Sequence, residues 1–336
     1  MSSILKSQAL TFPWPCRDPF LFCAHHLDRY PEGDGKMGPA APLTGRAIGQ
    51  DFSGKDGWSM YHGQTVPGFP QHPHRGFETV TVTQRGLVDH SDSLGAAGRY
   101  GEGDVQWMTA GAGIVHCEMF PLRDTTGPNT AELFQIWLNL PAEKKLVPPH
   151  FDMFWSEKIP TLRFGKQGEG ATRATLVAGV LDGVMALPPP PNSWAADPEN
   201  GVTILVLQME AGARWTLPPA LHDHVRSLYF HEGGAMTIDG RAIDGHAALW
   251  LKPDAPIALE AGKDGARLLL LQGLPIGQPV AQYGPFVMND EAGLRKAFED
   301  YQEHEFGGWP WPSDAPVHPA DQGRFARYPD GHVENP

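Results

Sequence analysis

Apolar and polar side chains alternate over short stretches of this chain, and glycines and prolines separate the stretches. The segment 77–83 alternates in this way, Gln84-Arg85-Gly86 is typical of a turn, and 87–90 follows as a return strand. Successive side chains of a strand point to opposite faces, so this pattern predicts strands with one buried face. Strands are expected at 77–83, 87–90, 104–108, 114–120, 133–140, 175–180, 202–209, 226–231, 247–251 and 267–272.

One segment near the C-terminus has helical spacing instead. Asn289 or Asp290 can cap its first turn. The apolar residues at positions i, i+3, i+4 and i+7 are Leu294, Ala297, Phe298 and Tyr301. The tail that follows, from residue 306, is rich in proline and aromatic residues and contains Trp309-Pro310-Trp311-Pro312. We expect this tail to be an extended arm packed on the surface.

The length of the chain predicts more than one domain. It has 336 residues, which is long for a single hydrophobic core. Its 39 glycines and 33 prolines favour an all-β protein built from many short strands. Several prolines interrupt the chain between 141 and 160, and we place a boundary there. The division predicts an N-terminal domain at 1–150, a C-terminal domain at 151–288, and a helix with a tail at 289–336.

The charge balance limits the partners that this chain is expected to bind. The formal net charge is −13, with no run of lysine and arginine, so direct binding to nucleic acid is not expected. The three cysteines, Cys16, Cys23 and Cys117, show no disulfide or zinc-knuckle spacing. The first twenty residues lack the pattern of a signal peptide, and no apolar stretch is long enough to span a membrane. A cytoplasmic location is expected.

Two pairs of potential metal ligands stand out. His72-Pro73-His74 and His116-Cys117-Glu118 each place two donors one residue apart. On a strand, residues i and i+2 share a face, so two adjacent strands would bring four donors together. Imidazole and carboxylate donors suit iron, manganese, zinc, nickel or copper, and four ligands leave positions open for substrate or oxygen. The alternative is a group of core histidines hydrogen-bonded to backbone.

The neighbours of these pairs predict which way they point. Ile114 and Phe120 share parity with His116, so the ligands are expected to face an apolar barrel interior. If the alternation continues unbroken through Arg75-Gly76, the face of the first pair also carries Glu78, Val80 and Val82. Thr79, Thr81 and Thr83 would then lie on the opposite face.

Three longer motifs carry a family resemblance. They are HPHRGFET at 72–79, GDVQWMTAG at 103–111 and GIVHCEM at 113–119. Together with Asp18-Pro19-Phe20 and the segment 284–289, they resemble the pirin family of the cupin superfamily over roughly residues 10–300. The resemblance implies an all-β bicupin, with two cupin-type β-barrels packed face to face. It also implies one metal in the first barrel, usually iron, with ligands at His72, His74, His116 and Glu118.

The resemblance implies two alternative functions. Some bacterial pirins resemble quercetin 2,3-dioxygenases, which would act on a small aromatic substrate such as a flavonol together with O2. Fe(II) is the expected metal, with Mn, Ni, Cu, Co or Zn as alternatives, and Glu118 would act as the general base. Other pirins resemble redox-dependent regulators, in which the oxidation state of the iron alters binding to a protein partner such as a transcription factor.

Glu78 and the segment His222-Asp223-His224 also carry potential metal ligands, but neither is predicted to bind the metal. Glu78 is interpreted as a group that orients an imidazole, because pirins draw their carboxylate ligand from the position of Glu118. His222-Asp223-His224 lacks a later His-x-Glu pair, so its histidines are expected at the solvent or at a pocket rim, and the second barrel without metal.

Three further features are expected to have structural roles. Gly111-Ala112-Gly113 is followed by a strand rather than a helix, so it is interpreted as a tight turn that aims His116 inward. Cys117 should point away from the ligands, as a small core residue. His90 is expected in a loop, with the barrel mouth as the alternative.

Overall fold

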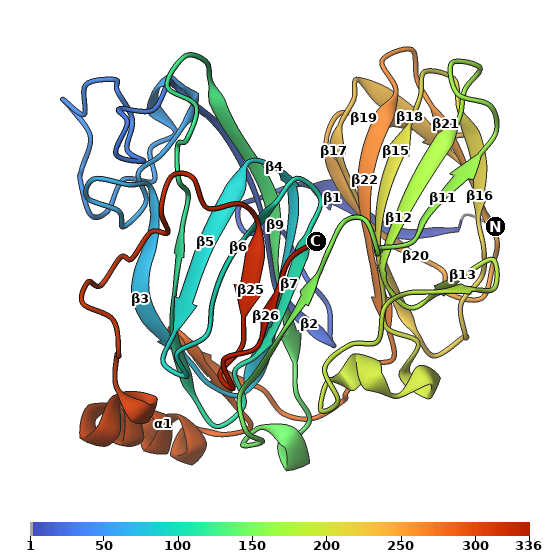
Figure 1. Ribbon diagram of the computed structural model, residues 1–336. Helices are drawn as coiled ribbons and strands as arrows, with labels where there is room; N and C mark the ends of the chain where they lie inside the picture. The colour runs from blue at the N-terminus through green and yellow to red at the C-terminus, as the bar shows by residue number, and fades with distance from the viewer. Residues whose placement is uncertain (1–2) are drawn as a thin grey trace. The chain divides into compact units, whose positions relative to one another are not determined.

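The computed structural model describes residues 3–336, which form two compact units (Figure 1). One comprises residues 25–136, 140–157 and 278–336 and is called the histidine unit here. The other comprises residues up to 24 together with 137–139 and 158–277, and is called the second unit. The N-terminal segment belongs to the second unit, and the C-terminal segment belongs to the histidine unit. Strand pairing explains this, because each end joins a sheet far away in sequence.

The histidine unit is built on two main sheets. The five-stranded sheet has the order β10 (His150–Phe154), β7 (Val105–Thr109), β4 (Phe77–Arg85), β9 (Asn129–Asn139) and β2 (Phe20–Tyr30). The six-stranded sheet has the order β26 (Val333–Glu334), β25 (Phe325–Arg327), β6 (Ala97–Gly101), β5 (Leu87–Asp92), β8 (Ile114–Met119) and β3 (Gly68–His74). The smaller elements are η1 (Lys55–Gly57), η2 (Ala142–Lys144), β23 (Ala281–Tyr283), β24 (Phe286–Met288), α1 (Glu291–His304) and η5 (Glu305–Gly307).

The second unit repeats the two-sheet plan. Its seven-stranded sheet has the order β1 (Ile4–Ala9), β20 (Ala247–Leu251), β17 (Val225–Glu232), β22 (Ala266–Gly273), β15 (Thr203–Met209), β12 (Thr172–Ala178) and β11 (Thr161–Phe164). Its four-stranded sheet has the order β16 (Arg214–Leu217), β21 (Ile257–Ala261), β18 (Ala235–Ile238) and β19 (Arg241–Asp244). The remaining elements are β13 (Val180–Leu181), β14 (Val184–Met185), η3 (Trp194–Ala196) and η4 (Pro198–Asn200). A core of leucine, isoleucine and other apolar side chains lies in this unit.

The strands and the helix predicted from the sequence are confirmed. Each of the predicted strands overlaps an observed one, and α1 begins at Glu291, directly after its cap. The Asp290 carboxylate accepts a hydrogen bond from the Gly293 N–H, and Leu294 and Ala297 bury the apolar stripe. The short strand β6 was missed, because its sequence, AGRYG, shows no apolar alternation. No helix of the described residues is long and apolar enough to cross a membrane.

The condition set for the parity after the first histidine pair is not met, because the alternation breaks at Arg75-Gly76. Gly76 has a φ of 85°, and here the chain leaves β3 in one sheet and enters β4 in the other. The alternation restarts after this break. The Thr81 hydroxyl lies 3.1 Å from Glu118 Oε1, so the threonines of β4 face the interior. Glu78 therefore lies on the opposite face of β4 from Thr81.

Gly76 gives a test of this turn. A Cβ at Gly76 would lie 2.0 Å from the Val287 carbonyl oxygen, whereas Gly95, with a similar φ of 80°, has open space around it. Both Gly→Ala variants should lose about 1–2 kcal/mol through the left-handed backbone. Gly76→Ala should lose a further 1–3 kcal/mol, roughly, through the clash. Urea denaturation of both variants measures this; equal unfolding midpoints would contradict the packing of β24 against the turn.

Candidate metal centre

The strand that carries the first histidine pair is an edge strand with an irregular ladder. β3 lies at the end of the six-stranded sheet and contains Pro70 and Pro73, which cannot donate hydrogen bonds. It pairs antiparallel with β8, with His72 directly opposite His116. Directly opposite residues share a face, so this pairing places both histidine pairs on one side of the sheet. The two-strand arrangement predicted from the sequence is present.

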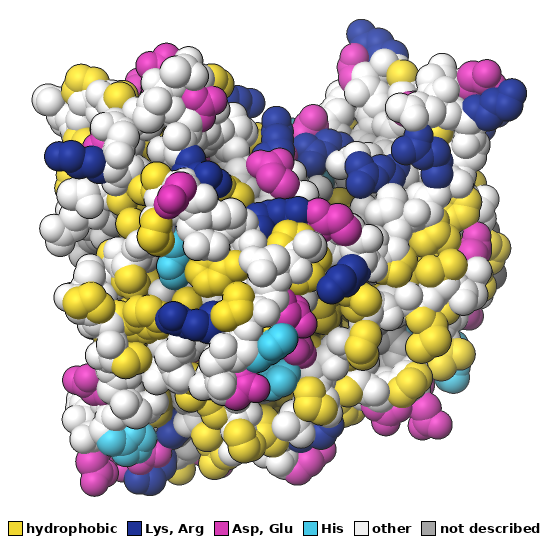
Figure 2. Space-filling model, viewed as in Figure 1, with side chains coloured by type: hydrophobic (Ala, Val, Ile, Leu, Met, Phe, Trp, Pro, Cys, Tyr) yellow, Lys and Arg dark blue, Asp and Glu magenta, His cyan; other side chains and the backbone are white. Residues whose placement is uncertain are grey.

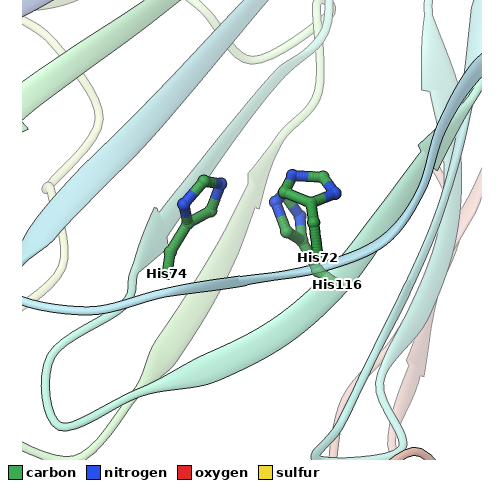
Figure 3. A group of neighbouring side chains, drawn as sticks. All are labelled: His72, His74 and His116. Atoms are coloured by element: carbon green, nitrogen blue, oxygen red, sulfur yellow. The ribbon is translucent and has the colours of Figure 1, made fainter. Parts of the chain in front are cut away.

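Three histidines come together on this face (Figure 3). The metal-binding atoms of His72, His74 and His116 all lie within 4.8 Å of one another. The ring centroids are 4.4 Å apart for His72 and His116, 5.0 Å for His74 and His116, and 4.8 Å for His72 and His74. His74 and His116 are buried, and His72 is half-buried. The group has the size of a site for one metal ion.

The hydrogen bonds of β3 fix how two of these rings are protonated. His72 Nδ1 lies 2.8 Å from the Pro70 carbonyl oxygen, and His74 Nδ1 lies 3.4 Å from that of Pro285. A carbonyl can only accept, so each Nδ1 is the donor and the lone pair of each ring is on Nε2. Burial lowers the pKa of His72 to about 4 and that of His74 well below its usual value. Both rings are neutral at pH 7, as metal ligation requires.

His116 is different from the other two histidines. It is fully buried, and neither ring nitrogen has a hydrogen-bond partner among residues 3–336. Burial, followed by the nearby His72 and His74 rings, lowers its pKa well below the usual value, so it too is neutral. A buried polar group of this kind normally has a partner. An ion bound between the three rings would provide one.

Glu118 lies on the same face of β8, but its carboxylate is not among the grouped atoms. It is buried and accepts a hydrogen bond from Thr81 Oγ1 at 3.1 Å. Burial raises its pKa, while the nearby His90 and the hydroxyls of Thr81 and Tyr100 oppose the rise. The structure therefore brings together three of the four predicted ligands, and ligation by Glu118 stays a prediction.

A histidine–aspartate pair on β5 extends this polar face, and the sequence analysis did not assign it. His90 lies directly opposite Glu118, and Asp92 directly opposite His116. His90 Nε2 lies 3.1 Å from Asp92 Oδ2, and the His90 ring centroid lies 5.6 Å from that of His116. The prediction that His90 lies in a loop was wrong, because β5 continues to Asp92. The sequence feature that could have identified this pair is the i, i+2 spacing of His90 and Asp92, which places both on one face of a strand. We call the inner face of β3, β8 and β5 the histidine wall.

The other predicted residues have different positions. The Glu78 carboxylate accepts a hydrogen bond from Thr109 Oγ1 at 2.7 Å and lies on the face of β4 opposite Thr81, and the interpretation that it orients an imidazole stays a prediction. His222 is exposed as predicted, but His224 is buried against Gly201 and not at the solvent. Cys117 is buried on the outer side of β8, as predicted.

The glycine turn before β8 has the predicted structural role. Gly111 has a φ of 50°, and a Cβ there would lie 2.1 Å from the Val147 carbonyl oxygen. At Gly113 a Cβ would lie 2.5 Å from the Phe306 ring. The turn therefore packs tightly at the entry to the strand that carries His116.

Two family descriptions match the chain, one in each half. The description Pirin matches residues 45–138, and Pirin C-terminal cupin domain matches residues 204–307. The chain belongs to the pirin family. The predicted fold of two cupin domains is therefore confirmed, and the histidine wall lies in the segment that the first pirin description covers.

Pirins from bacteria and plants are similar to this chain. A Pseudomonas aeruginosa protein named "Putative quercetin 2,3-dioxygenase" is 37% identical over 246 residues, covering 71% of this chain and 80% of the relative. A pirin-like protein of Solanum lycopersicum is 32% identical over 277 residues, covering 81% and 87%. The crystal structure of a quercetin 2,3-dioxygenase from Acinetobacter baumannii has a TM-score of 0.69 at 24% identity and covers 92% of this chain and 99% of that chain. This last likeness supports the pirin fold alone.

The residues of this pirin fit a divalent metal. The grouped donors are neutral imidazoles, which suit zinc, copper, iron and nickel. The unpartnered nitrogens of buried His116 are a second, independent indication. The Asp92–His90 pair beside them is the kind of hydrogen-bonded support that surrounds metal ligands.

The histidine group predicts which residues metal binding depends on. His74→Ala should lower the affinity for Fe(II) or Ni(II) at least about 100-fold, because loss of a ligand should exceed the effect of losing its support. His224→Ala, which removes a buried histidine of the second unit, should leave the affinity unchanged. Elemental analysis and anaerobic titration of both variants measure this. Equal binding by the two variants would contradict the assignment.

Proposed function

We propose that this pirin is a metal-dependent dioxygenase that acts on an enolic aromatic substrate of the flavonol type, with iron(II) as the ion. The observation that carries the proposal is the group of three neutral imidazoles, two of them buried and one half-buried, in which His116 has no hydrogen-bond partner among the described residues. The name of the Pseudomonas aeruginosa relative supports the substrate class. The fourth ligand would be Glu118, by rotation of its carboxylate toward the three rings.

In this proposal Glu118 takes the proton of the enolic hydroxyl of the substrate. Its carboxylate is buried beside the histidine group, and burial raises its pKa, which makes it a stronger base than an exposed glutamate. The Thr81 hydroxyl donates a hydrogen bond to Glu118 Oε1 at 3.1 Å and so helps to hold the carboxylate in place. The ion, when bound, would lower the pKa of the substrate hydroxyl and bring substrate and O2 together. His90, held by Asp92, faces the same carboxylate from the next strand.

An aromatic surface beside His72 suits a planar substrate. The Phe69 ring centroid lies 6.3 Å from that of His72, and Tyr61 stacks on Phe69 at 5.0 Å. Phe52 lies 6.4 Å from Phe69 and is 51% exposed. We call Phe52, Tyr61 and Phe69 the aromatic shelf.

The loop that presents Phe52 is held firmly. The buried Arg46 guanidinium donates to Asp51 Oδ2 and to the Trp58 carbonyl oxygen, each at 2.9 Å, and lies over the Trp58 ring at 3.3 Å. A buried ion pair of this kind keeps its loop in one arrangement, because breaking it leaves an uncompensated charge. These contacts therefore fix the loop that presents Phe52, and we propose that the Phe52 ring contacts the substrate.

The activity test is anaerobic loading with Fe(II), Mn(II), Ni(II) or Co(II), followed by oxygen uptake with quercetin. We expect turnover with at least one metal. In Glu118→Gln, kcat should fall about 100-fold or more, because a general base typically contributes 10²–10⁴-fold. Metal content is measured in the same samples, so that loss of the ion is separated from loss of the base. No uptake with any metal would reject the flavonol substrate but not the metal centre.

The aromatic shelf makes a separate prediction. Phe52→Ala should weaken quercetin binding about tenfold, since aromatic stacking contributes roughly 0.5–1.5 kcal/mol beyond burial. Phe12→Ala is the matched control, because Phe12 is 65% exposed and belongs to the second unit. Fluorescence titration of both variants with quercetin measures the difference. Equal affinities would show that the substrate does not use this surface.

The regulatory alternative stays a prediction. No feature of residues 3–336 favours it over catalysis.

A further inference from the structure

The C-terminal tail, defined here as residues 309–328, packs on the outer side of the sheet whose inner side is the histidine wall. Figure 1 shows it in red, leaving η5 and passing alongside β3 before β25 joins β6. On this face hydrophobic side chains gather over β3 and β5 (Figure 2). The packed residues are Trp309, Ala315 and Val317 from the tail, with Met37, Val66, Cys117 and Met119 beneath them. The tail therefore lies behind the strands that carry the predicted ligands.

A buried arginine holds the tail by its backbone. The Arg99 guanidinium makes a bidentate ion pair with Asp89, at 2.6 and 2.7 Å, and both side chains are fully buried. It also donates to the carbonyl oxygens of His318, Pro319 and Gln322, at 2.9, 2.8 and 2.8 Å. These contacts use all of the N–H donors of the side chain. Loss of such a buried, fully bonded charge pair would be strongly destabilising, so the tail is a fixed part of the unit.

The tail also holds the edge strand next to a predicted ligand. Between the pairs Phe69–Glu118 and His72–His116, β3 has two residues where β8 has one, which is a bulge. Gln71 lies in this bulge. Its N–H donates to the Asp314 carbonyl oxygen at 2.7 Å, and its side-chain amide donates to Asp314 Oδ1 at 2.8 Å. The tail therefore fixes the backbone from which the next residue, His72, projects.

A second contact reaches the strand on the other side of β8. Trp311 Nε1 donates to the Asp92 carbonyl oxygen at 2.8 Å. His318 Nε2 lies 3.1 Å from the His90 carbonyl oxygen. Asp92 is directly opposite His116 and its carboxylate is bonded to His90. The tail thus holds β3 and β5 from behind, one on each side of the strand that carries His116.

We infer that the tail is a brace that sets the spacing of the three histidines, with Trp311 and Asp314 as positioning residues for the metal centre. This inference rests on the proposed metal site. Edge strand β3, with two prolines and a bulge, has a sparse ladder to β8, so its position depends on the tail as well. The tail lies beyond residue 307, where the match to the pirin C-terminal domain ends. The brace is therefore a feature of this chain that the family match does not cover.

The test uses the full-length double variant Trp311→Phe, Asp314→Ala, which removes two hydrogen bonds and keeps the packed ring. The matched control is Trp215→Phe, Asp321→Ala: Trp215 is half-buried like Trp311 but belongs to the second unit, and Asp321 is exposed. Co(II) titration followed through the d–d absorption band reports both affinity and ligand geometry. In the double variant we expect about fivefold weaker binding, the equivalent of one net hydrogen bond, and a shifted band. The control should have the Co(II) affinity of the wild-type protein. The variant Trp311→Phe, Asp314→Asn keeps an acceptor oxygen at position 314, so it should regain most of the affinity that Trp311→Phe, Asp314→Ala loses.

Hydrogen exchange of residues 68–74 in the metal-free proteins is the second measurement. Exchange should be faster in the double variant than in the control. The inference that the tail positions the histidines would be rejected if the double variant had wild-type Co(II) affinity, an unshifted d–d band and unchanged hydrogen exchange. Failure of the proposed metal site gives a different result. In that case Co(II) binding by the wild-type protein would not depend on His74, while hydrogen exchange would still show whether the tail holds β3.

Discussion

The antiparallel pairing of β3 with β8 is the constraint on which the rest of the site depends. It places His72 directly opposite His116, and the period of two along each strand brings His74 and Glu118 to the same face. A shift of one residue in the register of β3 would turn His72 and His74 to the outer face, away from His116 and Glu118. The bulge between Phe69 and His72, the turn at Gly113 and the contacts of the tail all act on this register.

The sequence was sufficient for the local part of this arrangement. Alternation alone placed the strands, identified His116 and Glu118 as neighbours on an inward face, and put Ile114 and Phe120 beside them, where both are buried. Helix α1 was equally local, since its cap and apolar stripe lie within one segment. Such features follow from properties of adjacent residues, so they can be predicted without knowledge of the remaining fold.

What the sequence could not give depends on distant contacts. The change of parity after Gly76 follows from the passage of the chain between two sheets; Arg75-Gly76 marks where the alternation can break, but not that the next strand lies in another sheet. The contact of His90 with Glu118 needs the order of β5 and β8 in the sheet. The same limit applies to the tail, because the carbonyl groups that Arg99 binds are more than two hundred residues away along the chain.

A ligand bound at the histidine wall would stabilise the histidine unit. His72 and His74 each donate from Nδ1 to a backbone carbonyl oxygen. The alternative of core histidines hydrogen-bonded to backbone therefore accounts for one nitrogen of each of these two rings. It does not describe His116, whose buried nitrogens have no partner in the described part of the chain. Leaving such a group unsatisfied costs about 1–3 kcal/mol. A ligand that bonds to His116 in the folded state alone would recover this free energy and add its own binding free energy to the stability of the fold. A polar wall kept at that cost is better explained by a bound ligand than by packing, because apolar side chains of the same size would have stabilised the interior more.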